Sequence, residues 1–312
     1  MAVIDSCICL RLRMIARRTA VLYDAAFQPV GLTSSQFSAL RNIYRFVPLG
    51  ISELADVMLV ERTTLTRNLE LLRDEGLLTL SASEMDGRVF VPQLTVKGVK
   101  TLQTAIPKWR NVQRQFLGAI GTSGWRELLL SLRAAAAINE QVPQHLYVIS
   151  PRKESGDPSG TAGSEPLDLQ RCANSTMRGA ARFITREYEA ALRPTGLKAP
   201  QFHILAAILE NDRPRIGDLA SLLVLDQSST TLTVAAMRKK GWIEPKPSKK
   251  SSSTHPRGLA LTTAGKALLS EATSLWNDVQ RAKTKSASKQ AMLKWTHDFD
   301  RALVAALNTK AQ

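Results

Sequence analysis

Apolar residues recur at helical spacing along most of the chain. Near the start, Leu10, Met14, Val21 and Leu22 fall on one face of a predicted helix that ends before Pro29. The same spacing predicts further helices over about residues 33–45, 51–58, 61–74, 97–119 and 123–141. The chain is therefore expected to be mainly α-helical.

A β-hairpin is predicted in the middle of this helical pattern. The helix over residues 61–74 is followed by Gly76, a residue type that commonly ends helices. Two short strands are predicted next, over about residues 77–81 and 89–94. The dipeptide Asp86-Gly87 between them is a turn signal, so the two strands are expected to pair.

The whole pattern occurs twice. Residues 31–37 (GLTSSQF) recur as residues 196–202 (GLKAPQF), at an offset of 165, and residues 7–78 align with residues 172–243 without a gap. Beyond that point the offset grows to 167, which pairs Leu94 with Leu261, Thr95 with Thr262, Gly98 with Gly265 and Trp109 with Trp276. The chain is thus an internal duplication.

A linker separates the two copies. Residues 146–166 are rich in Gly, Pro and Ser and lack apolar spacing, which indicates a flexible segment. About 20 such residues span roughly 25 Å, enough to tether two domains that pack together. We therefore expect a first domain over residues 1–145 and a second over residues 167–312.

The order of elements within a copy predicts a winged helix-turn-helix. A short helix, a tight connection, a helix with a polar outer face and a β-hairpin follow one another. The DNA major groove admits one such helix, and the hairpin tip can carry a cation to the adjacent minor groove. In the first copy the outward positions of the second helix are all hydrogen-bonding groups: Arg62, Thr63, Thr64, Thr66, Arg67 and Asn68.

The charge of the chain agrees with a nucleic-acid partner. Its 312 residues include 42 Lys and Arg against 27 Asp and Glu, a formal charge of +15. Such an excess makes a polyanion the first expected partner. No apolar run is long enough for a membrane helix, and three cysteines are too few for a disulfide framework, so we expect a cytoplasmic protein without a membrane partner.

The sequence offers little for catalysis. It contains no phosphate-binding glycine loop and no Cys/His spacing typical of zinc. No nucleophile with a neighbouring base, and no paired carboxylates, stand out. We therefore predict neither an enzyme nor a cofactor or metal site.

Several motifs together resemble the MarR family of bacterial regulators. They are residues 60–69 (VERTTLTRNL), 75–77 (EGL), 86–88 (DGR) and 31–37, followed by Leu94-Thr95 and Gly98. The resemblance covers nearly all of both copies. It implies a dimer with interlocked N- and C-terminal helices and one winged helix-turn-helix per subunit. With both halves on one chain, it implies a monomer that forms an internal pseudo-dimer with pseudo-two-fold symmetry.

The resemblance assigns DNA-contacting residues in both copies. In the first they are the six outward residues of the helix, with Asp86 and Arg88 on the wing. In the second they are Gln227, Ser228, Ser229, Thr231 and Thr233 on the helix and Lys249, Lys250, His255 and Arg257 on a longer wing. Because Gln227 replaces Arg62 and Leu232 replaces Arg67, the second copy is expected to hold phosphates more than to read bases.

The family also implies release of DNA by a small molecule or an oxidant. A candidate pocket for a small aromatic effector is formed by Arg17, Tyr23, Phe37 and Trp109 in the first copy and Arg182, Tyr188, Phe202, His203 and Trp276 in the second. The arginines would meet a carboxylate of that ligand. The alternative is core packing with a structural arginine, the commoner role of such residues.

A redox switch at Cys9 is a further alternative. Its spacing before Tyr23 is similar to that of the reactive cysteine in the hydroperoxide-sensing branch of the family. Arg11, Arg13 and a helix N-terminus are expected to lower the pKa of the thiol. Against this, Arg13 occupies the place of that branch's tyrosine, and inert buried cysteines are more common.

The sequence thus predicts a sequence-specific transcriptional regulator that binds double-stranded DNA. The family resemblance favours a repressor over an activator. The competing class is a non-specific architectural DNA-binding protein, which would bind all sequences alike with a steep salt dependence.

Overall fold

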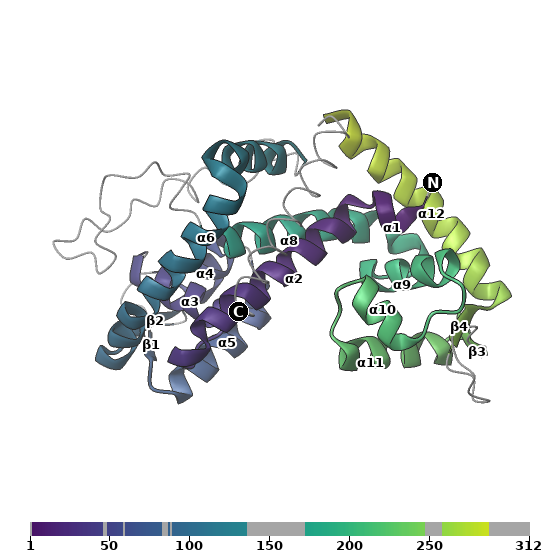
Figure 1. Cartoon of the computed structure of the whole chain (residues 1–312). Coiled ribbons are helices and arrows are strands. Elements are labelled where there is room, and N and C mark those ends of the chain that lie inside the picture. The colour runs from purple at the N-terminus through teal and green to yellow at the C-terminus, as the bar shows by residue number, and fades with distance from the viewer. Residues whose placement is uncertain are drawn as a thin grey trace. The chain divides into compact units, whose positions relative to one another are not determined.

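The computed structural model describes residues 2–45, 49–58, 60–82, 87, 89–135, 172–246 and 258–286. This part of the chain is mainly α-helical and contains two antiparallel two-stranded hairpins (Figure 1). The predicted fold class is confirmed. The predicted linker over residues 146–166 lies outside the described residues, so the domain boundaries stay predictions.

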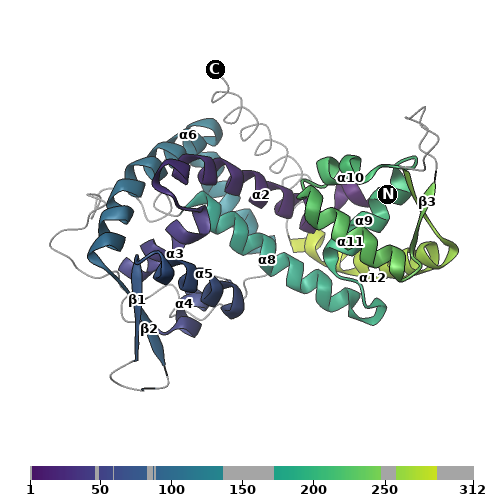
Figure 2. The same ribbon diagram turned by 90° about the horizontal axis from the view of Figure 1, so that it is seen from below.

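The first copy contains the predicted helices and hairpin in the predicted order: α2 (Ile8–Phe27), α3 (Ser34–Arg45), α4 (Ile51–Val57), α5 (Arg62–Asp74), β1 (Leu78–Ala82), β2 (Phe90–Leu94) and α6 (Val96–Ala135). Two short elements, α1 (Val3–Ser6) and η1 (Gln28–Val30), were not predicted. The break expected between the last two helices falls at Gly121, whose φ of 77° interrupts α6. Figure 2 shows the β1–β2 hairpin extending beyond α4 and α5 as a wing.

The second copy repeats this order. Its elements are α8 (Ala173–Leu192), η2 (Arg193–Thr195), α9 (Ala199–Glu210), α10 (Ile216–Leu222), α11 (Gln227–Lys239), β3 (Ile243–Lys246), β4 (Gly258–Leu261) and α12 (Thr263–Ser286). Strand β3 pairs with β4 from Ile243 opposite Leu261 to Lys246 opposite Gly258. In the first copy the pairing runs from Leu78 opposite Leu94 to Ala82 opposite Phe90.

The compact units of the structure do not coincide with the two copies. One unit groups the described residues of Met1–Arg17 with those of Phe183–Thr296, and the other groups those of Arg18–Arg182. Helices α2 and α8 each contribute to both units. Each winged lobe is thus completed by the N-terminal segment of the other copy.

Equivalent carboxylates hold the start of the same helix in both copies. Asp24 on α2 accepts a hydrogen bond from the backbone N–H of Ser34 at 2.6 Å. Glu189 on α8, the matching residue, accepts one from the N–H of Ala199 at 3.2 Å. The first N–H groups of a helix have no partner within the helix, so these bonds satisfy donors that would otherwise be unpaired.

The shared Leu-Thr-x-x-Gly motif joins each wing to the following helix. Thr95 Oγ1 donates to Gly76 O at 2.8 Å and accepts from the N–H of Gly98 at 3.0 Å. Thr262 makes the same two bonds to Gly241 O and the N–H of Gly265. A Cβ atom at Gly98 or Gly265 would overlap the carbonyl oxygen of Leu77 or Trp242. Both glycines are therefore required by the close approach of two backbones.

We expect Gly98→Ala to lower the free energy of unfolding by about 1–3 kcal/mol, because the new methyl must displace backbone. Gly118→Ala is the matched control on the same helix, since nothing lies within 4 Å of a Cβ there. The control should be neutral or raise stability by up to about 1 kcal/mol. Denaturant unfolding of both variants tests this, and equal stabilities would contradict it.

Candidate nucleic-acid interface

The first helix-turn-helix consists of α4 and α5. The N–H of Val60 donates to Ala55 O at 2.9 Å, which closes the turn between the two helices. Three leucines, Leu65, Leu69 and Leu72, form the buried face of α5, as their spacing predicts. This burial fixes which side of α5 faces outward.

The outward face of α5 presents hydrogen-bonding side chains. Arg62, Thr63, Thr64 and Arg67 are exposed, and no acidic residue lies in the first turn of the helix. Thr66 and Asn68 are half-buried, and their side chains form hydrogen bonds within the protein. Thr66 Oγ1 donates to Arg62 O at 2.9 Å, and Asn68 Nδ2 donates to Ser35 Oγ at 3.3 Å.

The structure therefore exposes four of the six predicted helix residues, and their DNA contacts stay predictions. On the wing, Asp86 and Arg88 lie outside the described residues, and their predicted contacts stay predictions.

The second helix-turn-helix has the same framework and different chemistry. The N–H of Leu225 donates to Ala220 O at 2.8 Å, and Asp226 caps α11 by accepting from the N–H of Ser229. This hydrogen bond lowers the pKa of Asp226. The exposed residues of α11 include Gln227, Ser228, Ser229, Thr231 and Leu232, while Thr233 is half-buried.

Two threonine hydroxyls of α11 bond to their own helix. Thr231 Oγ1 donates to Gln227 O and Thr233 Oγ1 to Ser229 O, both at 2.8 Å. The helix ends in exposed Arg238, Lys239 and Lys240. The predicted wing contacts at Lys249, Lys250, His255 and Arg257 lie outside the described residues.

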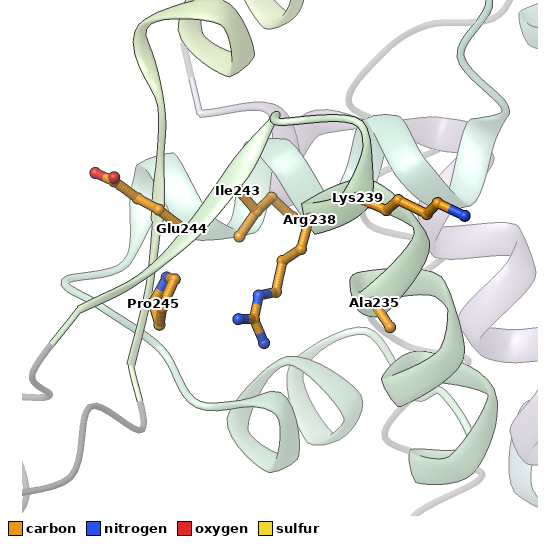
Figure 3. Close-up of a pocket in the computed structure, with 6 residues that line it drawn as sticks. All are labelled: Ala235, Arg238, Lys239, Ile243, Glu244 and Pro245. Carbon is orange, nitrogen blue, oxygen red and sulfur yellow. The ribbon is translucent and has the colours of Figure 1, made fainter.

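An open hollow at the base of the second wing was not predicted from the sequence. It has a volume of about 420 Å³ and is lined by Ala235, Arg238, Lys239, Ile243, Glu244 and Pro245 (Figure 3). The guanidinium of Arg238 lies between Ala235 and Pro245 in this view. The run of basic residues was visible in the sequence, but its position beside the hairpin depends on the fold.

Arg17 has a different partner from the one predicted. The sequence suggested a ligand carboxylate, but Arg17 Nη1 donates to Leu223 O and Val224 O, each at 3.2 Å. These carbonyls belong to the turn between α10 and α11, where Val224 has a φ of 51°. Burial, and then the nearby charge of Arg13, lowers the pKa of Arg17 to about 10, so the guanidinium stays charged at neutral pH. The N-terminal helix thereby fixes the turn before α11.

The aromatic residues of the predicted first pocket form a packed core. Phe37 stacks on Phe27 with ring centres 4.4 Å apart and on Trp109 at 6.3 Å. Tyr23 OH donates to Gln113 Oε1, which also accepts from the N–H of Ala173 at the start of α8. The first copy thus uses its aromatic residues to hold the N-terminal segment of the second.

The matching residues of the second copy surround Cys7. Trp276 Nε1 donates to Cys7 Sγ at 3.3 Å, and His203 Nε2 lies 3.3 Å from the same sulfur. Phe202 packs on both rings. Tyr188 OH donates to Gln280 Oε1. These contacts are core packing, so a ligand here would have to displace them, and the effector site, including Arg182, stays a prediction.

The surroundings of Cys9 shift the pKa of its thiol in the direction opposite to the one considered from the sequence, and a redox role for Cys9 stays a prediction. Its side chain is fully buried, with Sγ 3.7 Å from Thr185 Oγ1. Burial, reinforced by the neighbouring Cys7, raises the pKa of the Cys9 thiol to about 12. Sequence proximity to Arg11 and Arg13 suggested the opposite, but desolvation outweighs these charges. Because the thiolate is the reactive form, the structure does not support the argument for an activated thiol.

We expect Arg17→Met to lower the free energy of unfolding by about 1–3 kcal/mol, since two half-buried carbonyls lose their charged donor. Arg11→Met is the control, because Arg11 donates to the exposed Asp5 O, where water can replace it. Amide hydrogen exchange should also speed up at the turn before α11 in Arg17→Met. Unchanged exchange there would contradict the assigned contact.

We expect stability to decrease as the pH falls below 6.5. Burial, and then the charges of Arg13 and Arg17, lowers the pKa of His203 to about 3, so the unfolded chain binds a proton that the folded chain excludes. Between pH 6.5 and 5, where carboxylates remain ionised, this contributes up to about 1.4 kcal/mol per pH unit.

Denaturant unfolding at several pH values measures this slope. His203→Phe should reduce it, and an imidazole shift that titrates near pH 6.5 in the folded protein would contradict the assignment.

None of the helices in the described part of the chain is long and apolar enough to cross a membrane.

Comparison with known proteins finds one family that matches both copies. Residues 30–89 and residues 197–251 each match the MarR family. The structure of the M. tuberculosis transcriptional regulator MosR in complex with DNA is 44% identical in sequence, covering 37% of this chain and 84% of MosR, with a TM-score of 0.34. A second M. tuberculosis MosR structure is 29% identical, covering 46% and 97%, with a TM-score of 0.36.

Apo MarR from E. coli is 27% identical, covering 36% of this chain and 83% of MarR, with a TM-score of 0.31. No curated protein matches the chain significantly. With both matched segments on winged helix-turn-helix lobes, the chain belongs to the MarR family of transcriptional regulators and carries two family domains in tandem.

Proposed function

We propose that the protein is a sequence-specific repressor that binds its operator as a single-chain pseudo-dimer. The observation that carries this proposal is the outward face of α5, where Arg62, Thr63, Thr64 and Arg67 are exposed and the first turn of the helix contains no acidic residue. Such a face matches the donors and acceptors of base edges in the major groove. MosR, whose structure contains DNA, supports a DNA partner.

Pairing within one chain is supported by the way each lobe is completed. The lobe of the second copy receives Cys7 and Arg17 from the start of the chain. The lobe of the first copy receives Ala173 through Gln113, and Ser175 Oγ lies 3.2 Å from Ser38 Oγ. Segments exchanged in this way are what two subunits exchange in an interlocked dimer, so one chain supplies both partners.

The two lobes are proposed to play unequal parts. Helix α5 carries two exposed arginines for bases, whereas the matching positions on α11 are Gln227 and Leu232. Basic residues gather instead at the end of α11 and along the following wing, which suits phosphate contact. The operator would then be asymmetric, with half-sites about one helical turn, roughly 34 Å, apart.

We expect Arg67→Ala to reduce discrimination between the operator and unrelated duplexes by roughly 5- to 150-fold, because a bidentate arginine–base contact is lost. Arg73→Ala is the control on the same helix, since Arg73 pairs with Asp74 at the far end of α5. Competition binding at fixed salt measures both.

Equal weakening on all sequences would instead favour a non-specific architectural protein.

Replacing Lys249 and Lys250 with alanine should weaken binding to every sequence alike and reduce the salt slope by up to about two. The measurement is affinity against salt concentration. An unchanged slope, or equal binding to a symmetric palindrome and to the operator with one half inverted, would contradict the division of labour.

A further inference from the structure

The outer face of α11 carries an uncharged stripe. Ser228, Thr231, Leu232 and Ala235 are all exposed and follow helical spacing on one side of the helix. Leu232 is 73% exposed, while the opposite side of α11 buries Thr230, Val234 and Met237. Leu232 therefore takes no part in the core of its lobe.

The matching stripe on α5 is charged. It consists of Thr63, Thr66, Arg67 and Glu70. A single surface leucine needs no explanation. This one, however, occupies the place of the arginine best positioned to read bases, on a helix that ends in Arg238, Lys239 and Lys240. Figure 3 shows Arg238 and Lys239, which line the same hollow as Ala235.

Base edges offer one apolar group in the major groove, the C5-methyl of thymine. Leucine can contact this methyl but can make no hydrogen bond to a base, whereas arginine pairs with guanine. Gln227, exposed at the start of α11, has the amide that pairs with adenine N6 and N7. The hydroxyl side chains between them fit any base.

We infer that α11 reads A·T base pairs, with Leu232 contacting a thymine methyl and Gln227 an adjacent adenine, while α5 reads guanine through Arg62 and Arg67. This inference rests on the proposed function. It adds A·T recognition to the phosphate contacts that the proposed function assigns to the second lobe. Arg238 and Lys239 hold the phosphates that keep α11 in the groove.

The test removes the methyl group alone. The full-length chain selects its site from random duplexes, and each thymine of each half-site is then replaced by deoxyuridine. We expect one replacement in the A·T half-site to weaken binding about fourfold, the value of one buried methyl. Replacements in the guanine half-site should leave affinity unchanged.

Leu232→Ala should bind thymine and deoxyuridine sites equally. Leu209→Ala, a change at a 59% exposed leucine on α9, is the matched control and should keep the fourfold difference. Equal thermal unfolding of the two variants shows that both fold.

Leu232→Arg offers a gain of function, because it should shift the selected half-site toward guanine.

Three results would overturn the inference while leaving the proposed function intact. They are a guanine-rich second half-site, a wild-type protein insensitive to deoxyuridine in both half-sites, and a Leu232→Ala protein that keeps the difference. Selection that yields no preferred sequence would overturn the proposed function itself.

Discussion

The fold depends on an exchange of N-terminal segments between the two copies. Cys7 provides the clearest case, because its thiol accepts the indole N–H of Trp276 and lies beside His203, both in the second copy. The segment 2–17 is therefore part of the second lobe's core rather than an appendage to the first. Gln113 performs the reciprocal task by accepting from both Tyr23 and the N–H of Ala173. Removing either segment would leave buried polar groups without hydrogen-bond partners, which lowers stability.

This exchange also connects the core of the second lobe to α11, the second helix of its helix-turn-helix. Arg17 leaves the exchanged helix and binds the two carbonyls of the turn that precedes α11. A shift of the N-terminal helix would therefore move the start of α11, where Asp226 caps the helix and Gln227 begins it. The contact gives a short physical route between the N-terminal helix α2 and the exposed start of α11. It passes through a backbone turn rather than through the side chains that would touch bases.

Local pattern was enough to predict the helices, the hairpins and the duplication. Leucine spacing placed the buried side of α5, and Gly76 marked its end with a φ of 71°. The chemistry of the site was harder to predict. Cys9 lies against Thr185, and Arg17 binds carbonyls of Leu223 and Val224, all about 180 to 210 positions away, so sequence proximity does not reveal these contacts. Arg13 is close to Cys9 in sequence, yet burial decides the thiol's protonation.

Tethering explains why the two copies can differ on the outer faces of α5 and α11 and agree in the contacts of their cores. In a homodimer every substitution appears on both subunits, so both recognition helices must change together. A tandem chain removes that constraint, so the first copy can have Arg67 where the second copy has Leu232 at the equivalent position. The core contacts keep their symmetry, with Tyr23 on Gln113 and Tyr188 on Gln280. The same holds for the threonine that ties each wing to its following helix. Buried residues that match between the copies thus reflect shared packing, whereas exposed residues that differ are free to serve a separate role in each lobe.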